Sequence, residues 1–191
     1  MDHLHYYLIL DGAKMSPYLE TAKLMTPSHR SLYLTEDNDP LQLVAPYLFT
    51  FHYGSPFALW FESNAKGESW GTIFSSYKSF DHVFKHFRQN LFITTENNEK
   101  LYFRFYDPRV LRTFLPICTK QQLLKFFGPI HDITCEDLDE EYHLKFFLRN
   151  HELHKERRHT HHKIKQQHPS RDQTKSASET LPANKKNPWI D

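Results

Sequence analysis

The chain has 191 residues, a formal net charge of +1 and two cysteines, Cys118 and Cys135. This length allows one domain with a sizeable core and an appendage, and two cysteines are too few for a disulfide scaffold. The near-neutral charge favours no class of charged partner. Phe and Tyr are frequent, at 16 and 10 residues, which indicates an aromatic core with large side chains left over for an interface.

The first residues contain a short apolar run but no basic segment before it and no small-residue cleavage site. No stretch approaches 18 consecutive apolar residues. We therefore expect neither a signal peptide nor a membrane-spanning helix, and no membrane partner.

The first two thirds of the chain alternate between strand-like and helix-like patterns. Apolar runs typical of strands cover residues 6–10, 31–34, 46–51 and 70–74. Helical patterns follow Pro17 and Ser55-Pro56, and the clearest helix, residues 79–89, has an apolar stripe at positions 80, 83, 84 and 87. This alternation predicts a layered α/β or α+β domain over residues 1–135, with a mixed β-sheet flanked by helices.

A hairpin and two helices complete this predicted domain. The hairpin joins residues 91–95 and 101–106 through the polar loop "ENNEK". The helices cover 108–115 and 120–127. Asp107-Pro108 suits the start of the first, and Thr119 with Gln122 predicts a capping box for the second.

The composition changes near residue 136. Residues 136–168 contain no Gly or Pro, are acidic at the start and become basic and His-rich, which predicts one long C-terminal helix. Its apolar positions form our candidate partner-binding face: Tyr142, Phe146, Phe147 and Leu153. The alternative is that this face closes the domain core. Residues 169–191 are polar and poor in apolar side chains, which predicts a disordered tail.

Asp11 is the first candidate for chemistry, because it ends the first predicted strand. A carboxylate there can act as a nucleophile in phosphoryl transfer. Such chemistry usually needs a second acid two residues on, where this chain has Ala13. The alternative is a strand-ending turn, Asp11-Gly12, or an ion pair with an arginine.

The stretch "YFRFYDPRVLRTFLP", residues 102–116, concentrates aromatic and charged side chains. Arg104 lies between Phe103 and Phe105, so an inward-facing guanidinium would need a carboxylate partner. Asp11 or Asp107 could be that partner. We expect Arg104, Asp107 and Arg109 to form a structural polar network.

Half of the 14 histidines lie in the C-terminal quarter. They are His143, His151, His154, His159, His161, His162 and His168. His151 and His154 would share one face of the predicted helix, but Lys155 and Arg158 follow on that face and would repel a metal ion, so we expect no metal site. Acidic residues interrupt the basic tail, and only Trp189 offers a stacking ring there, so we expect no nucleic-acid partner.

Several stretches resemble the effector adaptors, or effector chaperones, of bacterial type VI secretion. They run in order over residues 8–130: "LILDGAK", "SLYLTEDNDPLQLVAPYLFTF", "WGTIFSS", "LYFRFYDPRVLRTFLP" and "QQLLKFFGPI". The family motif is carried by Asp11, Gly12, Trp70, Gly71, Arg104, Phe105, Tyr106, Asp107, Pro108 and Arg109. We expect most of these residues to determine the fold.

The resemblance implies a non-enzymatic protein of the bacterial cytoplasm that needs no cofactor. Such adaptors bind a toxic effector and help to load it onto the spike protein of the machine, which carries valine–glycine repeats. The alternative from another class is a small phosphate-processing α/β hydrolase-type enzyme centred on Asp11. The missing second acid and the chain's five glycines count against that alternative.

Overall fold

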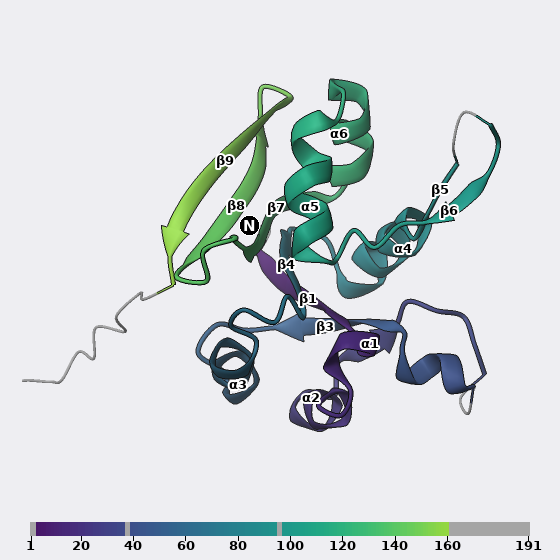
Figure 1. Ribbon diagram of the computed structural model, residues 1–191, viewed down its shortest axis with the longest axis vertical. Coiled ribbons are helices and arrows are strands. Elements are labelled where there is room, and N and C mark those ends of the chain that lie inside the picture. The colour runs from purple at the N-terminus through teal and green to yellow at the C-terminus, as the bar shows by residue number, and fades with distance from the viewer. Residues whose placement is uncertain (1–2, 37–38, 95–96, 161–191) are drawn as a thin grey trace, which may run out of the picture. The chain divides into compact units, whose positions relative to one another are not determined.

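A seven-stranded sheet organises the protein, for which we obtained a computed structural model. The structure describes residues 3–36, 39–94 and 97–160. These fall within one compact unit, Met1–His161. The sheet order is β2-β3-β1-β4-β7-β8-β9 (Figure 1). Its strands are β1 (His5–Asp11), β2 (His29–Ser31), β3 (Pro46–Phe51), β4 (Gly71–Ser76), β7 (Ile130–Glu136), β8 (Tyr142–Arg149) and β9 (Glu152–His159).

Helices cover both faces of this sheet, and a separate hairpin projects beside it. The α-helices are α1 (Gly12–Met15), α2 (Leu19–Met25), α3 (Pro56–Asn64), α4 (Phe80–Asn90), α5 (Pro108–Phe114) and α6 (Lys120–Phe127). Short 3-10 helices are η1 (Pro40–Leu43) and η2 (Leu115–Ile117). Strands β5 (Phe92–Thr94) and β6 (Lys100–Tyr102) pair only with each other in the described part of the chain.

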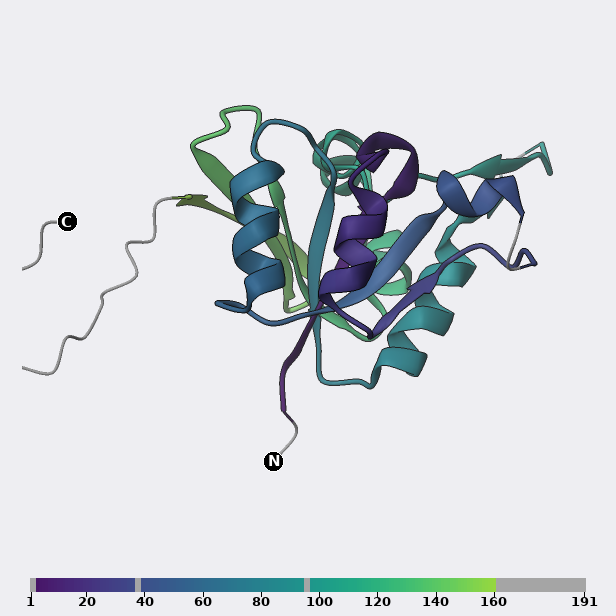
Figure 2. The same ribbon diagram turned by 90° about the horizontal axis from the view of Figure 1, so that it is seen from below.

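The two faces of the sheet bury separate cores. Alternate residues of β1 point to opposite sides, so Tyr7 and Ile9 join one core while Leu8 and Leu10 join the other. The first core lies under α4, α5 and α6. The second lies under α1, α2 and α3, and Figure 2 shows α2 and α3 together on that side.

The predicted mixed sheet is wrong, and the fold is α+β. Every pair of neighbouring strands is antiparallel. The helices do lie between strands, as expected. A parallel pair would need each helix to carry the chain back to the end of the sheet where the preceding strand began, and these connections do not do so. Each strand therefore runs opposite to its neighbours.

The predicted helix over residues 136–168 is also wrong. Residues 142–159 form the hairpin β8–β9, which continues the main sheet beside β7. Leu144, Phe146 and Leu148 alternate with polar or half-buried neighbours, which is the period of a strand. Asn150 and His151 both have positive φ, 53° and 63°, as a tight two-residue hairpin turn requires. The expected tail, residues 169–191, and the end of the expected helix lie outside the described residues.

Most local predictions for residues 79–127 are confirmed. Helices α4, α5 and α6 and the hairpin β5–β6 lie where the sequence predicted them, but β6 ends at Tyr102, so residues 103–106 do not form the strand that was expected. Asp107 caps α5 by accepting the N–H of Arg109, and Thr119 and Gln122 form the expected capping box at α6. The second strand is displaced, since β2 covers His29–Ser31 rather than residues 31–34.

Candidate protein-binding surface

The stretch "YFRFYDPRVLRTFLP" connects β6 to α5 and anchors the first core. Phe103, Phe105 and Tyr106 are buried there. The N–H of Phe103 donates to the carbonyl of Leu91 at 2.8 Å, and the hydroxyl of Thr72 donates to the carbonyl of Tyr106 at 2.8 Å. This irregular segment is therefore fixed to both the hairpin and the main sheet.

Two glycines of the motif permit close backbone approaches around β1. A Cβ on Gly71 would lie 2.0 Å from the carbonyl oxygen of Ile9, and one on Gly12 would lie 2.3 Å from that of Ala45. The N–H of Asp11 donates to the carbonyl of Trp70 at 2.8 Å. These contacts give Gly12, Trp70 and Gly71 roles in the fold.

Five charged side chains gather at the end of β1, and we call them the motif cluster: Asp11, Lys14, Arg104, Asp107 and Arg109. Asp11 forms a salt bridge with Arg104, and its other oxygen accepts the N–H of Ala13. Asp107 accepts the Nη2–H of Arg109 at 2.7 Å and its Nε–H at 3.1 Å. Of the two partners expected for Arg104, the structure selects Asp11 for the salt bridge.

In the motif cluster the carboxylates are buried and the arginines are partly exposed. Asp11 and Asp107 are 1% and 2% exposed, whereas the side chains of Arg104 and Arg109 are 41% and 57% exposed. Burial alone would raise the pKa of Asp107, but hydrogen bonds from Arg109 and the charge of Lys14 outweigh it and hold that pKa below its ordinary value. The ionised form of Asp107 is thus favoured, and both carboxylates lie beneath more exposed arginines.

A chain of three tyrosines lies beside this cluster. The hydroxyl of Tyr33 donates to that of Tyr102 at 2.9 Å, and the hydroxyls of Tyr102 and Tyr106 are 3.0 Å apart. Burial raises the pKa of Tyr106 to about 12 and also raises that of Tyr102, so these hydroxyls stay protonated. The chain joins the segment that follows β2 to the hairpin β5–β6.

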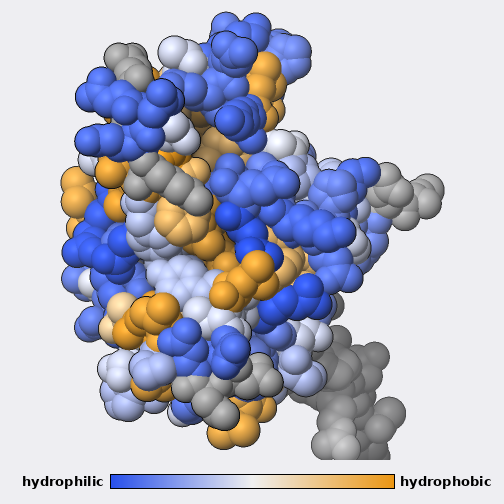
Figure 3. Space-filling view, turned by 90° about the vertical axis from the view of Figure 1, so that its right-hand side faces the viewer, coloured by the Kyte–Doolittle hydropathy of each residue, from blue (hydrophilic) through white to orange (hydrophobic). Residues whose placement is uncertain are grey.

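Apolar side chains, all exposed except the half-buried Tyr33, lie on the two segments that carry Tyr33 and Tyr102 and on the nearby η1. We call this set the apolar surface: Tyr33, Leu34, Leu41, Leu43, Val44, Ile93, Leu101 and Tyr102. Ile93 and Leu101 form a cross-strand pair on the hairpin and are 42% and 47% exposed. Figure 3 views the side that carries the hairpin and η1, and hydrophobic groups gather there between hydrophilic ones. Exposed patches of this kind mark interaction sites in soluble proteins.

The sequence predicted the hairpin but not this surface. The signal was present, because apolar residues occupy consecutive positions in both short strands, "FIT" and "KLY". A two-stranded hairpin cannot bury side chains on both of its faces unless something covers each face. One face of the hairpin β5–β6 therefore stays exposed.

The residues predicted as one partner-binding helix face are divided by the hairpin β8–β9. Phe146 is buried in the first core, and Leu153, paired with Leu148, packs against the same core. The ring of Tyr142 lies under Arg157, 3.6 Å from its guanidinium carbon. Phe147 points to the opposite side of the sheet and stacks on His154. The four side chains therefore do not form one surface.

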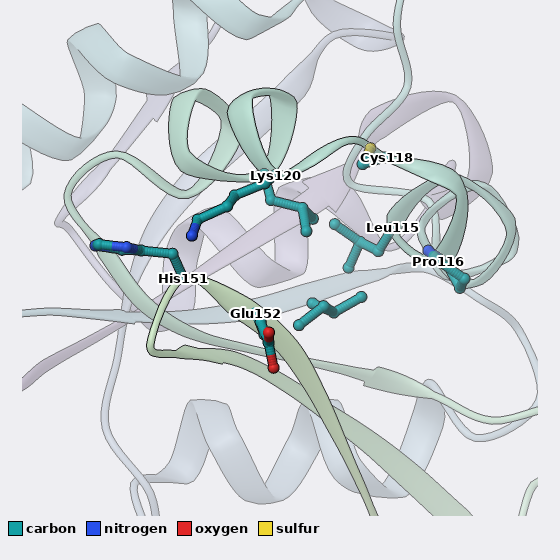
Figure 4. A pocket seen from close by; sticks show the side chains of 8 residues that line it. Leu115, Pro116, Cys118, Lys120, His151 and Glu152 are labelled. Carbon is teal, nitrogen blue, oxygen red and sulfur yellow. The ribbon is translucent and has the colours of Figure 1, made fainter.

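A small pocket lies where η2 and α6 approach the β8–β9 turn (Figure 4). It is lined by Leu115, Pro116, Cys118, Lys120, Leu123, His151, Glu152 and Leu153. The thiol of Cys118 donates to the carbonyl of Phe114, and burial raises its pKa, so it lacks the thiolate character of a reactive cysteine. This arrangement indicates no chemistry for the pocket.

The structure describes some of the C-terminal histidines. His151 lies in the β8–β9 turn and His154 on β9, while His161, His162 and His168 lie outside the described residues. Within residues 3–36, 39–94 and 97–160, no three His, Cys, Asp or Glu side chains are placed to hold a metal ion. In the same part of the chain no helix combines the length and apolar character needed to cross a membrane.

The fold and the surface define an α+β domain with a structural charge cluster and an exposed apolar face. Residues 6–125 match the family described as "Domain of unknown function (DUF4123)". The match covers more than half of the chain and includes every residue of the motif cluster, so the protein belongs to this family. Neither the curated proteins nor the solved structures contain a match to it.

Proposed function

We propose that this protein is a non-enzymatic adaptor of bacterial type VI secretion. It binds a toxic effector in the cytoplasm and helps to load it onto the valine–glycine repeat spike protein. The apolar surface carries the proposal. It lies within the part of the chain that matches the family, and it offers aromatic and branched side chains of the kind that anchor protein interfaces.

The arrangement of the motif residues supports an architectural role. Asp11, the nucleophile of the enzyme alternative, is buried, with one oxygen in the salt bridge to Arg104 and the other on the N–H of Ala13. A nucleophilic carboxylate needs an oxygen that can reach its substrate. The salt bridge between Asp11 and Arg104 joins β1 to the segment before α5, and Asp11 and Asp107 cap the starts of α1 and α5.

A secretion assay tests the proposal in the native bacterium. Deleting the gene for this chain should abolish export of one effector while other cargo of the same machine is still exported. Complementation with the wild-type chain should restore export, and complementation with Ile93→Asp/Leu101→Asp should not. Unchanged export of every effector in the deletion strain would contradict the proposal.

A further inference from the structure

The apolar surface and the motif cluster adjoin each other. Tyr106 connects them, because its hydroxyl lies 3.0 Å from that of Tyr102 and the next residue in the chain is Asp107 of the cluster. On the other side of Asp11, the N–H of Gly12 donates to the carbonyl of Ala45 at 3.0 Å, which brings Val44 to the cluster. Val44 is 43% exposed and belongs to the apolar surface.

The charge presented beside the apolar surface is positive. The cluster contains three cations and two carboxylates, but both carboxylates are buried beneath their arginines. Lys14 forms no salt bridge among the described residues; its amino group donates to the carbonyls of Glu68 and Ser69 at 3.3 and 3.2 Å. Within the motif cluster, a ligand arriving from solvent therefore meets the two arginines before their carboxylates, and the exposed Glu68, whose backbone carbonyl accepts from Lys14, lies beside the cluster.

We propose that this combined surface binds an acidic amphipathic segment of the effector. Apolar side chains of the segment pack on Val44, Leu101 and their neighbours, and its carboxylates face Lys14, Arg104 and Arg109. The inference rests on the proposed adaptor function and adds the chemistry of the partner. Planar guanidiniums that still have exposed N–H groups suit carboxylates, which they can bind in a bidentate manner.

The observations favour a protein segment over nucleic acid. Three cations neutralise few phosphates, and affinity for nucleic acid comes mainly from that neutralisation. Most of the combined surface is apolar, which suits the side chains of a protein segment better than a phosphate backbone. The three tyrosines are tied together by their hydroxyls, so they do not offer free stacking platforms.

Site-specific photo-crosslinking in the native bacterium tests the inference. A photoreactive amino acid replaces Val44 or Leu101 in the full chain, and the half-buried His154 on β9 is the matched control position. We expect crosslinks from positions 44 and 101 to one effector segment that contains apolar residues and a net negative charge, and few from position 154.

Other crosslinking results separate the inference from the proposed function. Crosslinks to the effector only from position 154, to a basic effector segment, or to the spike alone would overturn the inference and leave the adaptor function standing. Crosslinks to nucleic acid alone, or to neither effector nor spike at any of the three positions, would overturn both.

A charge variant gives a second readout on the isolated effector complex. Lys14→Glu should weaken effector binding about tenfold and reduce its dependence on salt, because an attractive charge is replaced by a repulsive one. Lys125→Glu, at an exposed position on α6, makes the same change of net charge and should leave binding unchanged. Equal effects of the two variants would overturn the assigned surface.

Discussion

Asp11 and Arg104 form a salt bridge across 93 residues of sequence, joining the end of β1 to the segment before α5. Asp11 is buried and its partner is partly exposed. Removing the guanidinium leaves a buried carboxylate without its counter-charge, which is the costly way to break such a pair.

We therefore expect Arg104→Ala to lower the free energy of unfolding by about 2 kcal/mol, less than for a fully buried pair because Arg104 reaches solvent. Arg149→Ala, at an exposed position, should change it by about 0.5 kcal/mol or less. The double variant Asp11→Asn/Arg104→Ala should recover part of the loss, since Asn keeps a cap for α1. Urea unfolding measures all three, and an Arg104→Ala protein as stable as wild type would show that the pair is not structural.

Gly71 gives a test of the sheet packing. A Cβ at this position would meet the carbonyl oxygen of Ile9, a backbone atom that cannot move aside. Gly71→Ala should cost about 2–3 kcal/mol. Gly54→Ala is the control, because a Cβ there has no neighbour within 4 Å and only the positive φ of 77° opposes it, at about 1 kcal/mol. Thermal unfolding that ranks Gly54→Ala as the more damaging change would contradict the described strand pairing.

In the hairpin β8–β9, two adjacent phenylalanines point to opposite faces of the sheet and differ in burial. Phe146 is 1% exposed in the first core, whereas Phe147 is half-buried on the opposite face. We expect Phe146→Ala to cost about 3–5 kcal/mol and Phe147→Ala about 1 kcal/mol. Similar losses for both variants would favour the helix that the sequence predicted, in which the two side chains share one apolar face.

His86 should make stability depend on pH. Burial lowers the pKa of its imidazole below 6.5, and its hydrogen bond to the carbonyl of Phe126 only partly offsets this. The folded-state pKa then lies below the unfolded one, so the stabilisation is present above about pH 6.5 and is lost as the pH falls towards the folded-state pKa. His86→Gln should lose less stability than wild type between pH 7 and pH 5 in urea titrations. Parallel pH profiles for the two proteins would contradict the assignment.

The sequence predicted the elements that depend on local chemistry. Asp107-Pro108 starts α5 and Thr119 with Gln122 starts α6, because capping is decided by residues within one turn. The Arg104 ion pair was also foreseen, since a charge between two buried aromatics needs a partner. The choice of Asp11 over Asp107 required the three-dimensional structure.

Three features could not be predicted from local sequence patterns. The strand directions depend on how each connection crosses the sheet, which local pattern does not encode. The region after residue 136 lacked Gly and Pro, and its hairpin turn is made instead by Asn150 and His151 with positive φ, which few non-glycine residues adopt. The apolar surface was missed because its residues come from separate segments that the tyrosine hydrogen bonds bring together.

The most direct test of the central claim is a pull-down from the native bacterium with the full chain as bait, in moderate salt, followed by identification of the bound proteins. The adaptor function predicts that a valine–glycine repeat spike protein and a toxin-like effector are recovered together, and that Ile93→Asp/Leu101→Asp recovers less effector while remaining folded. Recovery of neither protein, with phosphorylated small molecules or nucleic acids retained instead, would contradict it.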